Sequence, residues 1–282
     1  MNKLLSSNFG RLKKNKAFWI GTIFMLAAGV VVPVMRYITM QSYIARGDEF
    51  PLDRLEDDFF IYAVLISIVL SIVCSLFVST EYSNGTMRNK VIVGHSRASI
   101  YLANFITSMA VGLILCVSFI ITYLCVGIPL FGFFETDSQT ILSLMLCVFI
   151  MTIALSAIYT LIAMLNQNKA VVAVICLLSA FILLFAGAHI HKQLSEPEVY
   201  PHYSSDANGE LIVIDEIPNP NAITGTTREV YQFLYDFLPS GQAMQCYKLE
   251  AEHPVRIVIY SLIITVLTTG CGIFFFRRKN LK

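Results

Sequence analysis

Long apolar stretches separated by short polar connections dominate the pattern of this chain. A bilayer core about 30 Å thick is crossed by roughly 20 apolar residues in a helix, and six stretches reach that length. They cover approximately Phe18–Ile38, Phe59–Ser79, Ile100–Gly127, Thr140–Leu165, Ala170–Ala188 and Arg256–Phe276. The sequence therefore predicts an all-α polytopic membrane protein with six transmembrane helices, organised as a single membrane domain over residues 1–282.

The residues before the first span carry a helical pattern of their own. Within 2–16, the side chains of Leu5, Phe9 and Leu12 share one stripe, and lysines lie opposite them. This arrangement is typical of a helix that lies in the plane of an anionic membrane surface. We therefore expect an N-terminal interfacial helix, and a disordered basic tail is the alternative.

One connection, residues 189–254, is much longer than a simple turn. Asn208-Gly209 and the apolar residues after it predict a turn and a strand, hence a small hairpin at about 190–220. Two short helices are expected next, because apolar residues recur at helical spacing and Pro239 separates them. Both short helices are expected to rest in the outer leaflet, and they would form an external gate or lid, with simple anchoring in the leaflet as the open alternative. The gate residues are Tyr231, Phe233, Leu234, Phe237 and Leu238.

Composition and charge agree with a membrane protein and predict its orientation. Charged residues make up 14% of the chain and mean hydropathy is +0.68, whereas soluble domains carry roughly 25% charged residues. With the six spans drawn, 13 of 20 Lys and Arg residues fall on one side and 18 of 19 acidic residues on the other. Basic residues mark the cytosolic side, so both termini are expected there. Glu81 is then the one acidic residue on the cytosolic side.

Several chemistries are disfavoured by what the chain lacks. The interiors of the six spans contain no Asp, Glu, Lys or His, and proton-coupled carriers, ion pumps and intramembrane hydrolases need such groups at depth. The chain also has no G-x-x-x-x-G-K-[ST] loop to hold phosphates. Leu238-Pro-Ser-Gly-Gln242 superficially resembles the signature peptide of ABC ATPases, but it falls on the outer side. The chain therefore has no energy source of its own.

The histidines and cysteines of the chain are its candidate metal ligands and disulfide partners. His189 and His191, with His202 and His253 in the same connection, have the donor atoms for zinc or copper, but no spacing fixes a third ligand. We predict no metal site. Six of the seven cysteines lie inside spans and Cys246 is alone outside them, so no intrachain disulfide framework is expected.

The connection between the second and third spans carries the most informative motif. It reads Glu81-Tyr-Ser-Asn-Gly-Thr-Met-Arg-Asn-Lys90. With a cap at Ser79 or Thr80, Glu81 would lie in a first helical turn, where negative charge is favoured, and Gly85 permits a sharp reversal. We expect this segment to present one acid among hydrogen-bond donors to a cleft in a cytosolic protein. The alternative is an ordinary polar turn with a solvated Glu81.

This motif, continued by Gly94-His-Ser-Arg97, resembles the permeases of type-two ABC exporters. It is most similar to the small permeases of Gram-positive bacteria that export, or confer immunity to, peptide toxins and bacteriocins. The resemblance covers the basic N-terminal helix, the six spans and the two external helices before the sixth. It implies that residues 80–99 form a cytosolic coupling segment whose helix sits in a groove of the ATPase. The implied ATPase-coupling residues are Glu81, Tyr82, Ser83, Asn84, Gly85, Thr86, Arg88 and Asn89.

The resemblance also implies a function, partners and a location. The chain would be the permease subunit of an ATP-driven exporter in the plasma membrane, moving hydrophobic or amphipathic cargo, with peptides first. It would hold no cofactor, because a cytosolic ATPase subunit binds ATP and Mg²⁺. A second permease copy, identical or related, and the bilayer are the other expected partners, with no nucleic acid. A non-transporting membrane immunity or anchoring protein, and an exporter of lipids or lipophilic drugs, remain alternatives.

Overall fold

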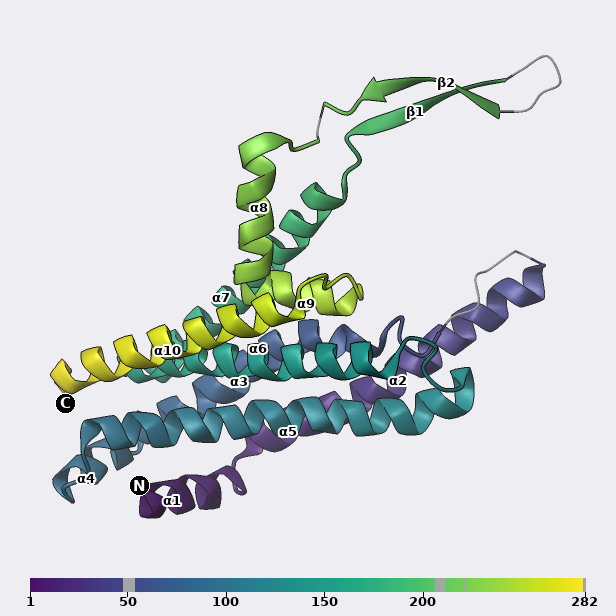
Figure 1. The fold of residues 1–282 in the computed structure, drawn as a ribbon. Coiled ribbons are helices and arrows are strands. Elements are labelled where there is room, and N and C mark those ends of the chain that lie inside the picture. The colour runs from purple at the N-terminus through teal and green to yellow at the C-terminus, as the bar shows by residue number, and fades with distance from the viewer. Residues whose placement is uncertain (48–53, 206–210, 221, 281–282) are drawn as a thin grey trace.

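The computed structural model describes residues 1–47, 54–205, 211–220 and 222–280 (Figure 1). Six of the helices in this part of the chain are long and apolar enough to cross a membrane. The prediction of an all-α polytopic membrane protein with six spans is confirmed. The spans are α2 (Lys16–Arg46), η1 with α3 (Phe59–Ile61 and Tyr62–Ser83), α5 (Arg97–Phe131), α6 (Ser138–Leu165), α7 (Lys169–Ser195) and α10 (Pro254–Arg278).

The spans extend beyond their predicted apolar cores, and α2 and α5 are the longest. Helix α2 has 31 residues and α5 has 35, and at 1.5 Å per residue both exceed a hydrocarbon core about 30 Å thick. The helices begin earlier than the apolar runs because polar residues cap them. The side chain of Asn15 accepts a hydrogen bond from the backbone nitrogen of Phe18 at 3.0 Å, and Ser96 accepts one from Ser99 at 3.1 Å.

Helix α3 lies at the centre of the bundle. In its most apolar stretch 67% of the residues are buried, against 22% in both α7 and α10, and it packs against α2, α5, α6 and α7. The two termini and α4 (Thr86–Ile92) lie at one end of the bundle (Figure 1). We call this the basic end, and we call the opposite end, toward which the β-strands project, the hairpin end.

Close backbone approach holds α2 against α5. A Cβ atom on Gly29 would lie 2.7 Å from the carbonyl oxygen of Phe119, so glycine is required at this contact. Small residues allow such approach between membrane helices. Next to it, Phe59, Tyr62, Phe119 and Tyr123 are almost fully buried and pack ring against ring. The hairpin end of α3 and α5 is therefore closed by aromatic packing.

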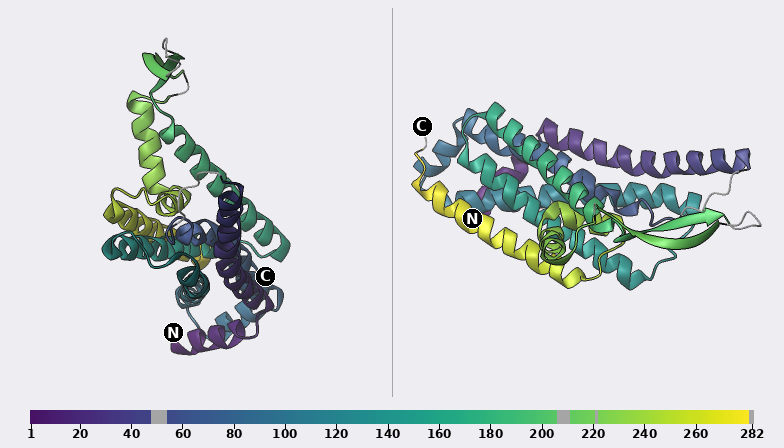
Figure 2. Two further views of the ribbon diagram at one scale, coloured as in Figure 1. Left: turned by 90° about the vertical axis from the view of Figure 1, so that its right-hand side faces the viewer. Right: turned by 90° about the horizontal axis from the view of Figure 1, so that it is seen from above.

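The long connection contains the predicted hairpin and two helices. Strands β1 (Val199–Ser205) and β2 (Leu211–Pro218) pair antiparallel, while α7 occupies the residues up to 195 that were also expected in the hairpin. The expected Asn208-Gly209 turn lies outside the described residues. Helix α8 (Gly225–Phe237) and the hairpin stand away from the bundle in Figure 1 and in the left view of Figure 2.

Helix α9 (Pro239–Tyr247) differs from the expectation that both short helices lie in the outer leaflet. Seven of its nine residues are buried, and it packs among α3, α6 and α7. A Cβ atom on Gly187 of α7 would lie 2.7 Å from the backbone of Ser240, so the two helices touch through their main chains. Its polar residues find partners inside the protein, since Gln242 donates to the carbonyl oxygen of Asp236 at 2.9 Å.

A buried carboxylate joins two connections at the hairpin end. Glu56 is 1% exposed, and its Oε1 accepts hydrogen bonds from the backbone nitrogen of Thr136 at 2.9 Å and from the Thr136 hydroxyl at 2.8 Å. Burial alone would raise the pKa of Glu56, but the hydrogen bonds from Thr136 and from neighbouring backbone groups outweigh it and lower the pKa below its ordinary value. The charged form of Glu56 therefore stabilises the folded protein.

Stability should consequently depend on pH through Glu56. A lowered pKa means that this stabilisation is present above the ordinary value near 4.5 and is lost as pH falls through the lowered pKa. Glu56→Gln should cost about 1.5–3 kcal/mol at pH 7, and this difference from the wild type should shrink below about pH 4. Thermal unfolding of the purified protein at pH 7 and pH 3.5 measures it. Glu135→Gln is the control, because the Glu135 carboxylate pairs with Arg54 while 65% exposed. An equal loss in both variants, or a difference independent of pH, would contradict this assignment.

Candidate functional site

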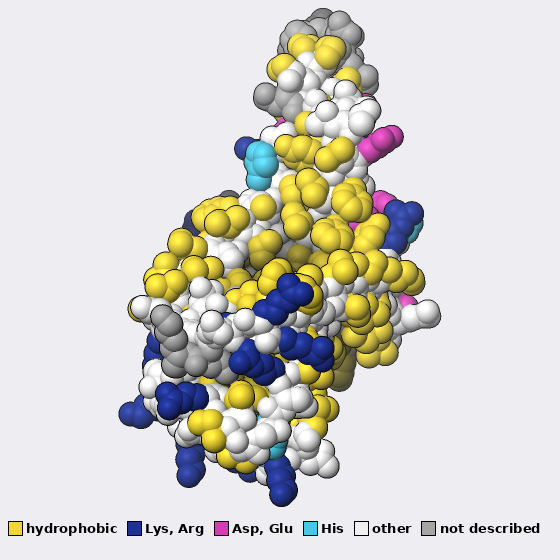
Figure 3. All heavy atoms as spheres, turned by 90° about the vertical axis from the view of Figure 1, so that its left-hand side faces the viewer, with side chains coloured by type: hydrophobic (Ala, Val, Ile, Leu, Met, Phe, Trp, Pro, Cys, Tyr) yellow, Lys and Arg dark blue, Asp and Glu magenta, His cyan; other side chains and the backbone are white. Residues whose placement is uncertain are grey.

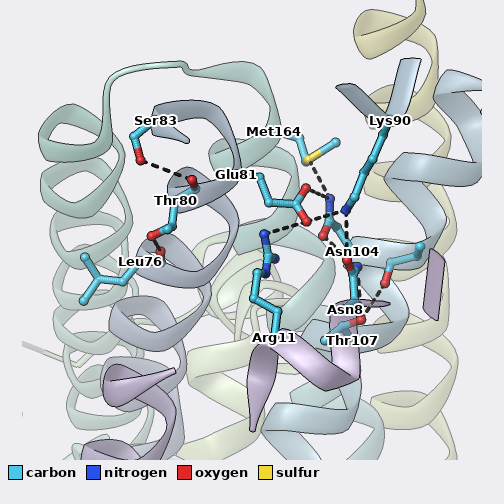
Figure 4. Close-up of polar contacts among 11 residues, drawn as sticks. Asn8, Arg11, Leu76, Thr80, Glu81, Ser83, Lys90, Asn104, Thr107 and Met164 are labelled. Carbon is cyan, nitrogen blue, oxygen red and sulfur yellow. Dashed lines mark hydrogen bonds and ion pairs between the residues drawn. The ribbon is translucent and has the colours of Figure 1, made fainter. Parts of the chain in front are cut away.

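The Glu81–Lys90 motif folds as a helix end, a tight turn and a short helix. Helix α3 continues to Ser83, so Glu81 lies in its last turn and not in a first turn as predicted. The helix runs on because the hydroxyl of Ser79 donates to the carbonyl oxygen of Ser75 at 2.5 Å. In the same way, the Thr80 hydroxyl donates to the carbonyl oxygen of Leu76 at 2.6 Å (Figure 4). Hydroxyls bonded back in this way do not cap a new helix. The reversal predicted at Gly85 is confirmed, with φ of 67°.

The carboxylate of Glu81 is turned inward, which corrects the expectation that it faces a partner. Its side chain is 0% exposed and is surrounded by donors from three other helices (Figure 4). Oε1 lies 2.7 Å from Nη1 of Arg11 and 2.5 Å from Nζ of Lys90, while Nδ2 of Asn104 donates to Oε2 at 3.0 Å. These contacts satisfy the carboxylate within the protein.

Asn8 completes this cluster from the N-terminal helix α1 (Asn2–Leu12). Its Oδ1 accepts from Nζ of Lys90 at 2.9 Å, and its Nδ2 donates to Oδ1 of Asn104 at 3.0 Å. The predicted N-terminal helix is present, but its buried face is Leu4, Asn8 and Leu12, which is rotated from the predicted apolar stripe. We call Asn8, Arg11, Glu81, Lys90 and Asn104 the polar clamp, because it ties α1, α3, α4 and α5 together.

The polar clamp holds two cations against one carboxylate in a place with little water. Burial lowers the pKa of Lys90, and the nearby Glu81 carboxylate opposes that effect. The guanidinium of Arg11 lies 4.0 Å from the centre of the Phe77 ring, which adds a cation–π contact. Removing one member of a buried ion pair leaves an uncompensated charge and costs about 3–5 kcal/mol. Because separating these charges is costly, the residues of the clamp should move together.

A second set of contacts fastens the neighbouring Tyr82 to the C-terminal end of the bundle. The Tyr82 hydroxyl donates to the carbonyl oxygen of Met164 in α6 at 2.5 Å. Nζ of Lys279 donates to the same carbonyl oxygen at 2.9 Å and lies 4.4 Å from the Tyr82 ring centre, and burial lowers the pKa of Lys279 to about 8. Arg97 donates to the carbonyl oxygens of Arg277 at 3.0 Å and of Lys279. The motif is thus joined to α5, α6 and α10.

The remaining predicted coupling residues lie on the surface. Ser83, Asn84, Gly85, Arg88 and Asn89 are exposed, and Tyr82 and Thr86 are half-buried. Two residues that were missed share the exposed face of α4 and its end: Ile92 is 69% exposed and Val93 is 77% exposed. The sequence signal for them is the occurrence of two large apolar residues side by side in a short polar connection. We call Asn84, Arg88, Asn89, Ile92 and Val93 the α4 face.

Basic side chains gather at the same end of the bundle as the α4 face. Figure 3 views the molecule from the basic end and shows Lys and Arg gathered there. Exposed members of this group include Lys3, Lys13, Lys14, Lys16, Arg88, Lys169, Arg277 and Arg278. A partner that binds this end therefore meets both an exposed apolar pair and a positively charged surface.

The residues predicted as an external gate lie on or just after α8. The rings of Phe233 and Phe237 stack with their centres 5.6 Å apart, and both pack edge-on against Tyr260 of α10. The Tyr231 ring centre lies 6.4 Å from that of His189, and Leu234 and Leu238 are half-buried. The structure thus brings Phe233 and Phe237 against α10, and Tyr231 near α7. No group of three or more His, Cys, Asp or Glu suited to a metal ion occurs among the described residues.

A known family covers this part of the chain. The family described as "ABC-2 family transporter protein" matches residues 4–187. The chain belongs to this family. The match includes the polar clamp, the α4 face and most of α7, and it ends before the hairpin, α8, α9 and α10. No curated protein matches the chain. The chain is accordingly the transmembrane permease of an ABC transporter, and the family implies an ABC ATPase partner.

Proposed function

We propose that this ABC permease exports hydrophobic or amphipathic cargo, with peptides as the first candidate, and that its ATPase partner acts through the α4 face. The basic end then faces the cytosol, as the distribution of Lys and Arg predicts. The observation that carries the proposal is the pairing of an exposed α4 face with a buried clamp beneath it. A basic surface that served only to set the orientation of the chain in the membrane would not need to expose Ile92 and Val93. It would also not need a polar clamp that joins four helices beneath them.

The clamp offers a route for force from α4 into the spans. Lys90 on α4 bonds to Glu81 at the end of α3, and α3 is the most buried span. A displacement of α4 would therefore move α3 and, through Asn8 and Asn104, also α1 and α5. The ATPase supplies the energy and binds ATP and Mg²⁺, while this chain converts the displacement into altered packing of α2, α3 and α7 around a central path.

The chemistry of the spans favours apolar cargo. Within the described spans the charged side chains lie toward the helix ends, such as Arg36, Lys169 and Arg278. The buried polar side chains at depth are mostly hydroxyls, including Thr152, Ser156 and Thr160. Such a path offers no counter-charge to a small ion and suits a hydrophobic or amphipathic molecule. A second permease copy, identical or related, would complete the path.

Reconstituted transport tests this proposal. The purified permease, with the ATPase subunit that copurifies with it, is placed in liposomes, and movement of a fluorescent amphipathic peptide is followed with and without ATP. We expect ATP-dependent movement that requires both subunits. Peptide binding without movement would favour an immunity or anchoring role instead. Movement of a fluorescent lipid or lipophilic dye, but not of the peptide, would reassign the cargo.

A further inference from the structure

A polar cavity of about 240 Å³ lies on the hairpin side of the molecule. It opens where the end of α7, helix α8 and the connection between α9 and α10 meet, beyond the residues that the family matches. Figure 1 shows α8 and the end of α7 leaving the bundle next to one another above α9. The side chains that matter for its chemistry are His191, Arg228, Tyr235, Asp236, Glu250 and Glu252.

Asp236 is a buried residue whose carboxylate has one oxygen that accepts no hydrogen bond from the described residues. The residue is 8% exposed, and the side-chain amides of Gln232 and Gln245 donate to its Oδ1 at 3.4 and 3.1 Å. Among the described residues no hydrogen bond reaches Oδ2. Oδ2 is not among the buried polar atoms that lack a partner, so it is open to the cavity. This atom is therefore suited to a ligand that donates hydrogen bonds and carries positive charge.

The other charges of the cavity favour a cation. Asp236, Glu250 and Glu252 provide three carboxylates against the single guanidinium of Arg228, which is itself engaged with the carbonyl oxygen of Leu194 at 3.4 Å. A concave site lined mainly by one sign of charge attracts the opposite sign. The carbonyl end of α7, where charge is partly negative, adds to the same effect.

An aromatic wall and a fixed frame complete the site. The rings of His191 and Tyr235 stack with centres 5.9 Å apart, and Nδ1 of His191 lies 2.9 Å from the Tyr235 hydroxyl. Aromatic faces stabilise bound cations. Gln245 also donates to the backbone oxygen of Tyr235 at 3.0 Å, and Ser261 of α10 donates to Oε1 of Gln242 at 2.6 Å. Asp236 is thus held in place by α9, which is itself bonded to α10.

We propose that this cavity binds an amine or guanidinium group, with Asp236 and Glu250 as its counter-ions. As part of transport, the inference rests on the proposed function: the cavity would receive the positively charged part of an amphipathic cargo as it leaves the spans. The apolar part of the same cargo would lie against the rings of Phe233, Phe237 and Tyr260 on the neighbouring face of α8 and α10.

Binding of agmatine, which carries both an amine and a guanidinium, tests the site. Saturation-transfer NMR on the purified permease in nanodiscs gives its Kd, with glutarate as an anion of similar length. We expect agmatine to bind and glutarate not to. Asp236→Asn with Glu250→Gln should weaken agmatine binding about tenfold or more, because charge-assisted hydrogen bonds are lost. The control is Glu229→Gln, which removes an exposed acid of α8 that does not line the cavity and should change Kd less than twofold.

The outcomes separate this inference from the proposed function. Equal affinity in the double variant and the wild type, equal binding of glutarate, or an equal effect of Glu229→Gln would overturn the inference. Should Asp236→Asn unfold the protein, Glu250→Gln alone decides, because the Glu250 side chain is 56% exposed and its loss leaves the fold intact. The assay needs neither ATPase nor nucleotide. Agmatine binding without ATP-driven export would refute the proposed function alone, and export without agmatine binding would refute the inference alone.

Discussion

Replacing Glu81 by alanine should abolish export and destabilise the permease by about 3–5 kcal/mol, because it leaves Arg11 and Lys90 buried without their counter-ion. Thermal unfolding of the purified protein and ATP-dependent transport in liposomes measure the two effects. Glu81→Gln keeps an acceptor for Asn104 but not the charge, so it should fall between alanine and the wild type. No other substitution of a single side chain in the motif should cost as much stability.

The double variant Glu81→Ala with Lys90→Met separates the charge effect from the loss of contacts. Removing one cation along with the carboxylate should recover a large part of the lost stability. Ser83→Ala is the matched control, because Ser83 is exposed in the same turn of α3 and should change the unfolding free energy by less than about 0.5 kcal/mol. A wild-type melting temperature for Glu81→Ala would show that the clamp does not hold these helices.

Placing an acid on the α4 face should release the ATPase without unfolding the permease. Ile92→Asp with Val93→Asp removes the two most exposed apolar side chains of this face and buries charge in any interface. Truncating a hot-spot residue of an interface costs about 2 kcal/mol or more, so, with Ile92 and Val93 as the centre of the interface, we expect at least about a thirtyfold loss of affinity. The melting temperature should stay near that of the wild type, since both side chains already face solvent. Copurification of the ATPase with the tagged permease measures the effect.

A matched control sits at the other end of the bundle. Phe133 is 78% exposed in the connection between α5 and α6, so Phe133→Asp introduces the same charge onto an apolar surface residue. It should leave ATPase copurification unchanged. Loss of the ATPase in both variants would point to a general effect of surface charge, and retention in both would exclude the α4 face as the docking surface.

The six spans could be predicted because each is a long apolar run in a chain of low charge. Sequence also identified the reversal at Gly85 and the hairpin in the long connection, since glycine and turn residues act locally. Span ends were less predictable. Asn15 and Ser96 extend α2 and α5 beyond the apolar cores through capping bonds, and such bonds depend on backbone geometry as well as on residue type.

The inward orientation of Glu81 could not be predicted from its own segment. Its partners Arg11 and Asn104 lie far away in the sequence, and each satisfies it only because α1 and α5 pack beside the end of α3. The pattern of α1 misled for the same reason. Asn8 reads as a polar surface residue until Lys90 and Asn104 supply its hydrogen bonds. Ile92 and Val93 lie just beyond the polar residues of the motif, and the exposure of such apolar side chains depends on how α4 packs.

Helix α9 illustrates the same limit at the other end of the chain. Gln242 and Gln245 are polar, yet both are buried and hydrogen-bonded to residues of α8. A buried amide is stable only when such partners exist. Tertiary contacts, rather than local pattern, decide where this helix lies.

Site-specific photo-crosslinking from α4 tests the central claim most directly. A photoreactive phenylalanine analogue placed at Ile92 is irradiated in membranes that hold the complete transporter, with Phe133 as the comparison site. We expect the analogue at Ile92 to form a covalent adduct with the ABC ATPase and the analogue at Phe133 to form none. A complex that retains the ATPase but yields no adduct from Ile92 would contradict the claim that force enters this permease through the α4 face.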